Sequence, residues 1–436
     1  MICGVDASQA SPRLSYVTDR PRRAWGAIHL EAALVEHGWQ SVDFVVVGWV
    51  RRNVSYKHPV SGEGVQARKE SSLARYDSLT VWRGVACLMV VIYHSIFTGY
   101  ARTVPAEGNL VFEVLRKGWL GVPLFFVISG YCVTASAEAL RRQGAPARSF
   151  FWRRFRRIYP PYWVWVGLMA VSVYVVEAFV APGYFQAAMV PNPQGLTFWQ
   201  WVGNLTLTES WRWHWTGGVE SALWSPGWTL CYEEQFYFLV GMILLMARRF
   251  FFVALAVLTA AVVIGLFLSE WNSQGTFLDG KWLMFAAGVL VYFILNRVPC
   301  ERRAWYCLPL LLGVLCAVAD PGQLLRPAVN EPNQSYLTAF AFALALVFLK
   351  KWDGFVSHSG VFRPLRFCGE MCYSLYLVHW PVVTIVGHAL DSIGITHPIG
   401  ILAITVPCAV GVTILLGRGF HALVERRFWN PRIGVS

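Results

Sequence analysis

The chain has 436 residues, of which 56% are hydrophobic and only 14% are charged. A soluble protein usually has about 25% charged residues, and the apolar residues here form runs of about twenty, the length that crosses a bilayer. The formal net charge of +12 would fit a nucleic-acid partner, but Arg and Lys cluster in short loops between the apolar runs, as the positive-inside rule expects. The composition therefore excludes a soluble nucleic-acid-binding protein and predicts an all-α polytopic membrane protein.

The ten cysteines include no Cys-x-x-Cys pair and no spacing typical of a metal site. Most lie within apolar runs, where a cysteine behaves as a small hydrophobic residue. Neither a disulfide framework nor a bound metal is predicted.

Residues 1–75 differ from the rest of the chain. They are rich in Arg, Pro, Gly and Ser, and their apolar patch at 42–50 is too short to span a membrane and lacks the order of a signal peptide. Two interpretations stay open: a poorly ordered N-terminal extension, or upstream sequence translated from a wrongly assigned start.

About ten spanning helices are predicted within a membrane domain at 76–430. They are expected near 79–99, 118–137, 160–181, 226–246, 251–269, 279–296, 304–319, 335–350, 368–390 and 399–418. With the N-terminus inside, the cytoplasmic loops would hold most of the Lys and Arg residues, so both chain ends, including the tail 431–436, are expected in the cytoplasm.

The first predicted span carries Arg83 near its start and His94 near its end. Eleven residues at about 100° each place both on one helix face, about 16 Å apart along the axis. Ionisable groups within a membrane are costly and usually face protein or a water-filled cavity, so both are candidates for function. The alternative is an arginine that reaches the interface and a hydrogen-bonded structural histidine.

The second span contains the run 121–130, in which Ser129 supplies a hydroxyl group in an apolar setting. Its small residues would let a helix or a ligand approach closely, and helix packing alone would explain them.

Four arginines then fall within residues 153–157, among aromatic residues. Arg154 and Arg157 would share a helix face, and their guanidinium groups suit phosphate oxygens; ordinary positive-inside charge is the alternative. Pro160 and Pro161 are expected to begin the third span, because proline is tolerated in the first turn of a helix.

A loop at about 182–225 is expected outside the membrane and is rich in Trp, including Trp199, Trp211 and Trp215. Anchoring at the membrane interface is one interpretation. A flat aromatic platform for carbohydrate is the other.

The fourth span places Glu233 beside Glu234 in apolar sequence, which is expensive in a membrane. Counting helical rise puts Glu233 and His94 at similar depths, so a carboxylate could orient an imidazole that acts as a general base. In the ninth span, the run 369–381 contains Tyr373 and His379. His379 is expected near mid-membrane, in a core network or along the substrate route.

Taken in order, these stretches resemble the integral-membrane acyltransferase-3 family. The resemblance covers about residues 76–430. It rests on Arg83 and His94, Phe125-Phe-Val-Ile-Ser-Gly130, the run 154–163, Glu233 with 235–237, and Tyr373-Ser-Leu-Tyr-Leu-Val-His-Trp-Pro381. The chain departs from the family pattern at 81–82 and 370–372, away from the expected chemistry, and residues 1–75 have no counterpart in it.

The resemblance implies an O-acyltransferase of the bacterial inner membrane. It would move an acyl group, most often acetyl from cytoplasmic acetyl-CoA, to a hydroxyl of a cell-surface or lipid-linked glycan. His94 would be the general base and Glu233 would orient it. The acyl-CoA would be bound by Arg83, Arg154, Arg157, Phe125, Phe126 and Ser129, with Glu234, His379 and Tyr373 along the pathway or in support.

Two other functions stay open at this point. One is acyl transfer to a secreted small molecule such as a macrolide. The other is a non-enzymatic transporter or exporter, although the sequence lacks the internal repeats with interrupted helices that many transporters have. A covalent acyl-histidine intermediate also stays open.

Overall fold

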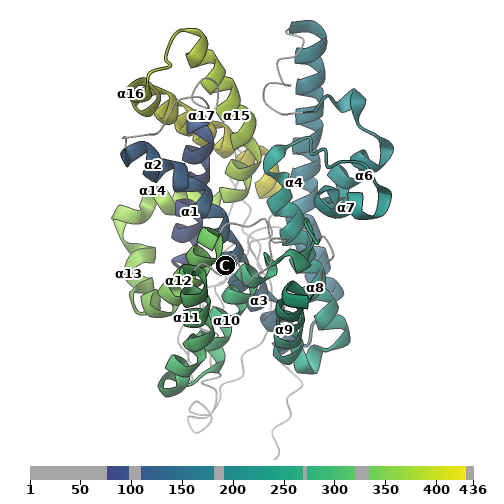
Figure 1. The fold of residues 1–436 in the computed structure, drawn as a ribbon, viewed down its shortest axis with the longest axis vertical. Helices are drawn as coiled ribbons and strands as arrows, with labels where there is room; N and C mark the ends of the chain where they lie inside the picture. The colour runs from purple at the N-terminus through teal and green to yellow at the C-terminus, as the bar shows by residue number, and fades with distance from the viewer. Residues whose placement is uncertain (1–75, 98–109, 181–190, 269–272, 320–332, 429–436) are drawn as a thin grey trace, which may run out of the picture. The chain divides into compact units, whose positions relative to one another are not determined.

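The computed structural model describes residues 76–97, 110–180, 191–268, 273–319 and 333–428. The chain divides into two units, Met1–Ser71 and Ser72–Ser436, and all described residues belong to the second. The expected N-terminal extension with its 42–50 patch, and the tail 431–436, lie outside the described residues. Within those residues the chain is helical and no strand occurs (Figure 1).

A helix occupies each of the ten ranges in which a span was predicted. These helices are α1 (Leu79–Ile96), α3 (Gly121–Arg142), α4 (Arg148–Val175), α8 (Trp228–Met246), α9 (Phe251–Leu268), α10 (Trp282–Arg297), α11 (Arg303–Val318), α12 (Asn333–Leu349), α15 (Cys372–Ser392) and α17 (Val406–Phe420). The other helices are short: α2 (Leu110–Arg116), α6 (Phe198–Thr206), α7 (Glu209–Thr216), α13 (Asp353–His358), α14 (Arg363–Glu370), α16 (Pro398–Gly400) and α18 (Arg426–Phe428).

Six helical segments among the described residues are long and apolar enough to cross a membrane. They are Leu79–Ile96, Leu110–Arg142, Arg148–Phe179, Ser225–Met246, Arg248–Leu266 and Pro398–Phe428. Helices α10, α11 and α12 have 16, 16 and 17 residues, fewer than the roughly 20 that a straight span needs, and the polar residues of α15 lower its mean hydropathy. The all-helical membrane fold is therefore confirmed, whereas the number of about ten spans and the cytoplasmic ends stay predictions.

Helix α4 begins earlier than the sequence predicts. It starts at Arg148 and continues through Pro160 and Pro161, so the expected start at the proline pair is wrong. Each proline removes only one backbone hydrogen bond, and side-chain hydrogen bonds hold the helix on both sides of the pair. The Tyr373 hydroxyl donates to the Ile158 carbonyl at 2.9 Å, and the Tyr162 hydroxyl donates to the Asn204 carbonyl at 2.7 Å.

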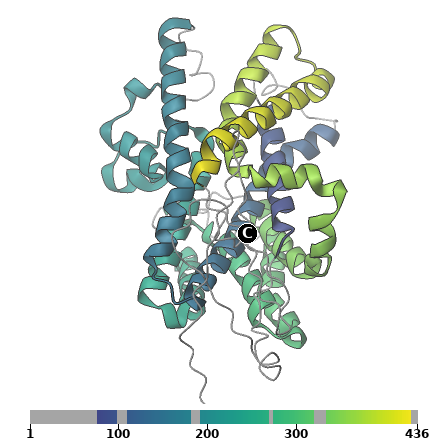
Figure 2. The same cartoon turned by 180° about the vertical axis from the view of Figure 1, so that it is seen from behind.

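Glycines let neighbouring helices cross with their backbones in contact. A Cβ atom on Gly84 of α1 would lie 1.9 Å from the Leu365 carbonyl oxygen of α14, and one on Gly369 of α14 would lie 1.7 Å from the Thr80 oxygen of α1. A Cβ atom on Gly130 of α3 would lie 2.1 Å from the Phe285 carbonyl oxygen of α10, a close crossing as expected for the small residues of that run. These crossings join α1 to α14 and α3 to α10, and Figure 2 shows α1, in purple, beside the light green α14.

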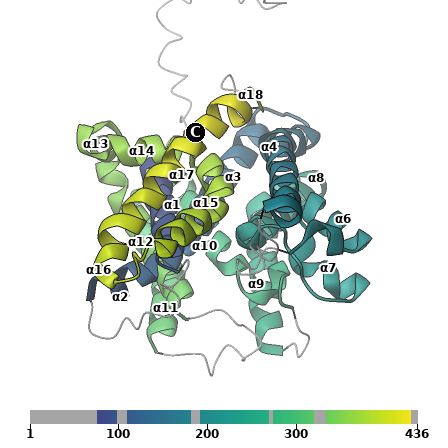
Figure 3. The same ribbon diagram turned by 90° about the horizontal axis from the view of Figure 1, so that it is seen from above.

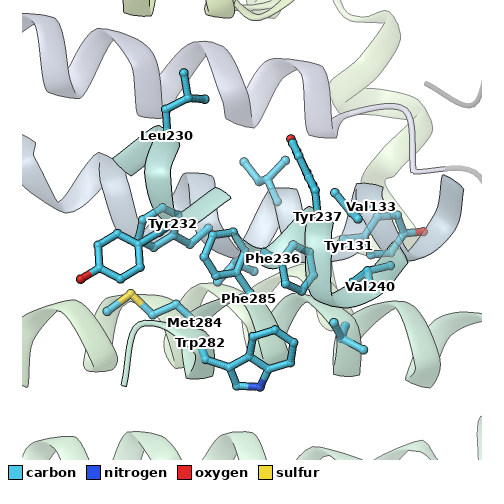
Figure 4. Packing of buried hydrophobic residues seen from close by; sticks show 14 of the residues in the cluster. Tyr131, Val133, Leu230, Tyr232, Phe236, Tyr237, Val240, Trp282, Met284 and Phe285 are labelled. Atoms are coloured by element: carbon cyan, nitrogen blue, oxygen red, sulfur yellow. The ribbon is translucent and has the colours of Figure 1, made fainter. Parts of the chain in front are cut away.

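Aromatic residues fill the core between α3, α8 and α10. Phe285 of α10 stacks on Phe126 of α3 and on Phe236 of α8, with ring centroids 4.5 Å and 4.6 Å away. Figure 4 shows Phe285 beside Phe236. Helices α6 and α7 lie beside α4 and α8, on the side away from α1, α14 and α17 (Figure 3). The core thus holds α3 and α8 face to face, which positions the polar residues described next.

Candidate active site

A cavity of about 110 Å³ lies between α1, α3, α4, α8 and α15. It brings together most of the residues that the sequence singled out, although they come from five helices spread along the chain. The predicted site residues in its wall are Arg83, Phe125, Phe126, Ser129, Arg154, Arg157, Glu233, Tyr373 and His379. His94 and Glu234 are not among its lining residues.

The cavity is elongated along the helices. On α1 its wall runs from Arg83 to Val91, and on the adjacent α15 it runs from Cys372 to His379, about 10–12 Å of helical rise. Three arginines therefore gather at one end, which we call the arginine end (Arg83, Arg154, Arg157). His379 lies at the other, the histidine end.

The arginine end carries an excess of positive charge. The lining residues include three guanidinium groups but only one carboxylate, that of Glu233. Arg154 lies over the Tyr237 and Phe150 rings, with its Cζ atom 5.0 Å and 5.5 Å from their centroids. Guanidinium groups held in this way suit a phosphate or another anion.

Glu233 is held by two hydroxyl groups in the middle of the cavity wall. Its Oε1 atom accepts a hydrogen bond from Ser129 Oγ of α3, at 2.5 Å, and another from the Tyr237 hydroxyl one turn along α8. The sequence predicts His94 as the partner of Glu233, but the structure pairs Glu233 with Ser129 and Tyr237, because α3 faces it across the cavity. Tyr237 has no assigned role in the sequence analysis, although it belongs to the matching run 235–237 and lies four residues from Glu233.

His94 lies just beyond the histidine end. Its ring centroid is 5.3 Å from that of His379 and 4.8 Å from that of Trp380, at right angles to the indole. His379 is the histidine that lines the cavity, and its Nδ1 atom lies 2.5 Å from the Tyr376 carbonyl oxygen. The two predicted histidines are thus neighbours, with His379 toward the cavity.

Glu234 and Gln235 point away from the cavity, because successive residues of a helix are about 100° apart. Glu234 interacts with the Tyr159 hydroxyl of α4. The Gln235 side chain donates to the Gly275 carbonyl at 2.9 Å and accepts from the Phe277 amide at 2.8 Å. Only the first residue of the Glu-Glu-Gln run therefore contributes to the cavity; the third anchors a loop.

The Trp-rich segment is organised by a buried ion pair. Arg212 Nε lies 2.8 Å from Glu209 Oε2, and this hydrogen bond raises the pKa of Arg212. Trp199 and Trp215 are exposed, whereas Trp224 is buried and packs against Tyr376 in the cavity wall, with ring centroids 4.6 Å apart. The tryptophans thus divide between an exposed face and support for the cavity.

In the described part of the chain, no three His, Cys, Asp or Glu side chains are grouped as metal ligands would be. The cavity instead offers guanidinium groups for an anion, hydroxyl groups, one carboxylate and one imidazole. This set can bind an anionic molecule at one end and exchange a proton at the other.

Comparison with known proteins places the chain in a family. Residues 76–418 match the family model of the acyltransferase-3 type, described as an acyltransferase domain. The peptidoglycan O-acetyltransferase OatA of Listeria monocytogenes is 24% identical over 72% of this chain and 50% of its own length. The exopolysaccharide production protein ExoZ of Rhizobium meliloti is 26% identical over 71% of this chain and 89% of its own.

The O-acetyltransferase OatA of Staphylococcus aureus is 23% identical over 70% of this chain and 50% of its own length. The chain thus spans about half the length of the OatA proteins and most of ExoZ. No solved structure matches the chain.

Proposed function

Because this chain belongs to the acyltransferase-3 family, we propose that it is a membrane-bound O-acyltransferase that moves a short acyl group from acyl-CoA to a hydroxyl of a glycan. The observation that carries this proposal is the cavity itself. It joins an end with three guanidinium groups to an end with an imidazole, with a carboxylate between them. The guanidinium groups suit the phosphates of the donor, and the imidazole can accept the proton that the acceptor hydroxyl releases.

The donor would enter at the arginine end. Arg154 and Arg157 would bind the phosphates of acyl-CoA through charge-assisted hydrogen bonds, and Arg83, deeper along α1, would lie beside the pantetheine arm or the thioester. Phe125 and Phe126 would form the apolar wall.

The names of two relatives favour an acetyl group. The OatA proteins of Listeria monocytogenes and Staphylococcus aureus are named O-acetyltransferases, so acetyl-CoA is the proposed donor.

The chemistry would take place between Glu233 and the histidine end. The acceptor oxygen attacks the thioester carbon, its proton passes to the His94–His379 pair, and the carbon–sulfur bond breaks to release the thiol of coenzyme A. Ser129 donates a hydrogen bond to Glu233, so we assign Ser129 to the wall that holds Glu233, and Arg83 to the pantetheine arm of the donor. Tyr373 would support the site by fixing α4, through its bond to the Ile158 carbonyl.

The proposed acceptor is a cell-surface or lipid-linked glycan, and the proposed location is the bacterial inner membrane. Two relatives bear names that refer to peptidoglycan and to exopolysaccharide, which supports an acceptor of this class. The apolar helices support a multi-pass membrane protein, with the bilayer as its surroundings.

Mass spectrometry of glycans tests the proposal. Surface and lipid-linked glycans are compared between a deletion strain, a strain complemented with the native gene, and one complemented with the Arg154→Ala, Arg157→Ala double variant. An acyl-sized mass difference that only the native gene fully restores is expected. An unchanged glycan profile with the protein present in the membrane would instead favour a small-molecule acceptor or a transporter.

Measuring the acetyl-transfer rate in membranes at increasing acetyl-CoA concentration distinguishes the arginines that line the cavity from one that does not. The Arg154→Ala, Arg157→Ala variant should raise the apparent KM for acetyl-CoA at least tenfold. Arg153→Ala on the same turn serves as the control, because Arg153 does not line the cavity. Equal effects of the two variants would indicate that the arginine cluster serves only as positive-inside charge and does not bind the donor.

A further inference from the structure

His379 is the most buried ionisable side chain in the cavity wall. It is 0% exposed, yet it lines the cavity at the end opposite the arginines. A buried imidazole without hydrogen bonds is costly, so each ring nitrogen should have a partner. Among the described residues the Nε2 atom has none.

The partner of the other nitrogen fixes the form of the ring. The Nδ1 atom lies 2.5 Å from the Tyr376 carbonyl oxygen, and a carbonyl can only accept a hydrogen bond, so Nδ1 must carry a proton. In the neutral ring Nε2 then has a free lone pair. The same contact keeps the ring from turning, so this lone pair belongs to a fixed atom of a cavity-lining residue.

We propose that His379 is a catalytic residue and that its Nε2 atom receives the proton of the acceptor hydroxyl. This inference rests on the proposed function. As the acceptor O–H bond breaks, the acceptor oxygen forms a bond to the thioester carbon and the proton moves to Nε2. The carbon–sulfur bond then breaks, and the thiolate of coenzyme A takes the proton back from Nε2. The products are an ester and a thiol, and His379 returns to its neutral form.

His94 is then a positioning residue rather than the group that meets the substrate. Its ring lies behind His379, 5.3 Å away, between Tyr93 at 5.0 Å and Trp380 at 4.8 Å. It does not line the cavity. Contact with the His94 ring would keep the His379 ring in the orientation in which its Nδ1 atom donates to the Tyr376 carbonyl.

Chemical rescue tests this division of roles. His379→Ala and His94→Ala variants are prepared in membranes, and acetyl transfer is measured with and without added imidazole. His388→Ala serves as the control, because His388 is on the same helix but does not line the cavity. We expect His379→Ala and His94→Ala each to lose at least 100-fold in kcat and the control to keep native activity.

Imidazole should restore His379→Ala at least tenfold, because the deleted ring leaves a space that opens into the substrate cavity. It should leave His94→Ala unchanged, because the His94 ring lies against His379 and Trp380 and does not line the cavity, so imidazole bound there would not face the acceptor hydroxyl. The KM for acetyl-CoA should stay native in His379→Ala, since the donor binds at the other end.

Two results would overturn the inference. One is full activity of His379→Ala, and the other is rescue of His94→Ala without rescue of His379→Ala, which would make His94 the base. Failure of the proposed function is distinct, because then the native protein itself transfers no acyl group from acetyl-CoA in the same membranes.

Discussion

Glu233 receives hydrogen bonds from two hydroxyl groups, one from Ser129 of α3 and one from Tyr237 of its own helix. Its carboxylate is also the negative charge among three guanidinium groups of the cavity wall. A buried charge of this kind is kept only where it is paired or used. At the scale of single residues, Glu233 therefore lies between the proposed donor half of the cavity and the half in which we propose that the proton moves.

Glu233→Gln should lower kcat for acetyl transfer about 100-fold, equivalent to about 2.7 kcal/mol in the activation barrier. The amide has the shape of the carboxylate but lacks its charge and offers a donor where two hydroxyl protons already point. Initial rates in membranes measure the effect, and Glu234→Gln is the matched control because its side chain faces Tyr159 outside the cavity. A loss as large in the control as in Glu233→Gln would contradict the assignment.

Helix α1 carries Arg83 and His94, so the packing of α1 against its neighbours decides where these two side chains lie. It crosses α14 at Gly84 and Gly369, where each Cα faces a backbone carbonyl of the other helix. At the scale of elements, these two glycines are required by the close approach of two backbones and by nothing in their own helices.

Gly84→Ala and Gly369→Ala should each destabilise the protein by at least the 1–3 kcal/mol that overpacking usually costs. The new methyl group would lie under 2 Å from a backbone oxygen, and a backbone cannot move aside as a side chain can. Thermal unfolding in detergent measures this. Gly167→Ala on α4 has no neighbouring atom within 4 Å and should be neutral or slightly stabilising, through helix propensity. A comparable loss in all three variants would refute the steric explanation.

The start of α1 is tied down by a carboxylate from another element. Asp353 of α13 accepts hydrogen bonds from the backbone amides of Ser78, at 2.7 Å, and Asp77, at 3.1 Å, and from the Lys350 ammonium group at 2.7 Å. Burial alone would raise the pKa of Asp353, but these hydrogen bonds outweigh it and lower the pKa below its usual value. This carboxylate replaces the side-chain cap that α1 lacks at Ser78.

Asp353→Asn should lower the free energy of unfolding by about 1 kcal/mol at neutral pH, as loss of a helix cap does. Because the pKa of Asp353 is lower in the folded protein than in the unfolded chain, its contribution is complete above about pH 5. It is lost as the pH falls below about 4. Thermal unfolding from pH 7 to pH 3.5 checks this: the difference in stability between native and variant should narrow on acidification. A difference that stays constant would exclude ionisation of Asp353 as its source.

At the scale of the whole molecule, the cavity lies entirely within one of the two units of the chain. Its lining residues run from Arg83 to His379, the second unit begins at Ser72, and the family match begins at residue 76. Five helices that are far apart along the chain must pack together before the cavity exists.

A chain that starts at residue 72 should therefore keep both membrane expression and acetyl transfer, within about twofold of the full chain. The expectation follows from the domain boundary predicted at 75 and 76. Expression in the deletion strain, followed by the glycan assay, measures it. Loss of transfer by a truncated protein that still accumulates in the membrane would show that residues 1–71 contribute to function.

The amino-acid sequence by itself determined the class of the protein and most of the site's residues. Runs of about twenty apolar residues have few folds open to them, because backbone polar groups in a bilayer must bond within the segment. Ionisable residues in such runs are costly enough to stand out one by one. That is why Arg83, Glu233 and His379 could be selected without knowledge of their contacts, whereas Arg154 and Arg157 were selected by the density of arginines beside aromatic residues.

Only the tertiary structure decided which of these residues meet. Helical periodicity places Arg83 and His94 on one side of α1, but the packing of α15 puts His379 between His94 and the cavity. The packing also makes Ser129 and Tyr237 the hydrogen-bond partners of Glu233. Helix α4 continues through Pro160 and Pro161 in the folded protein. Partners across helices depend on crossings such as that at Gly84, where contact is set by residues distant in the chain, and local periodicity holds no information about them.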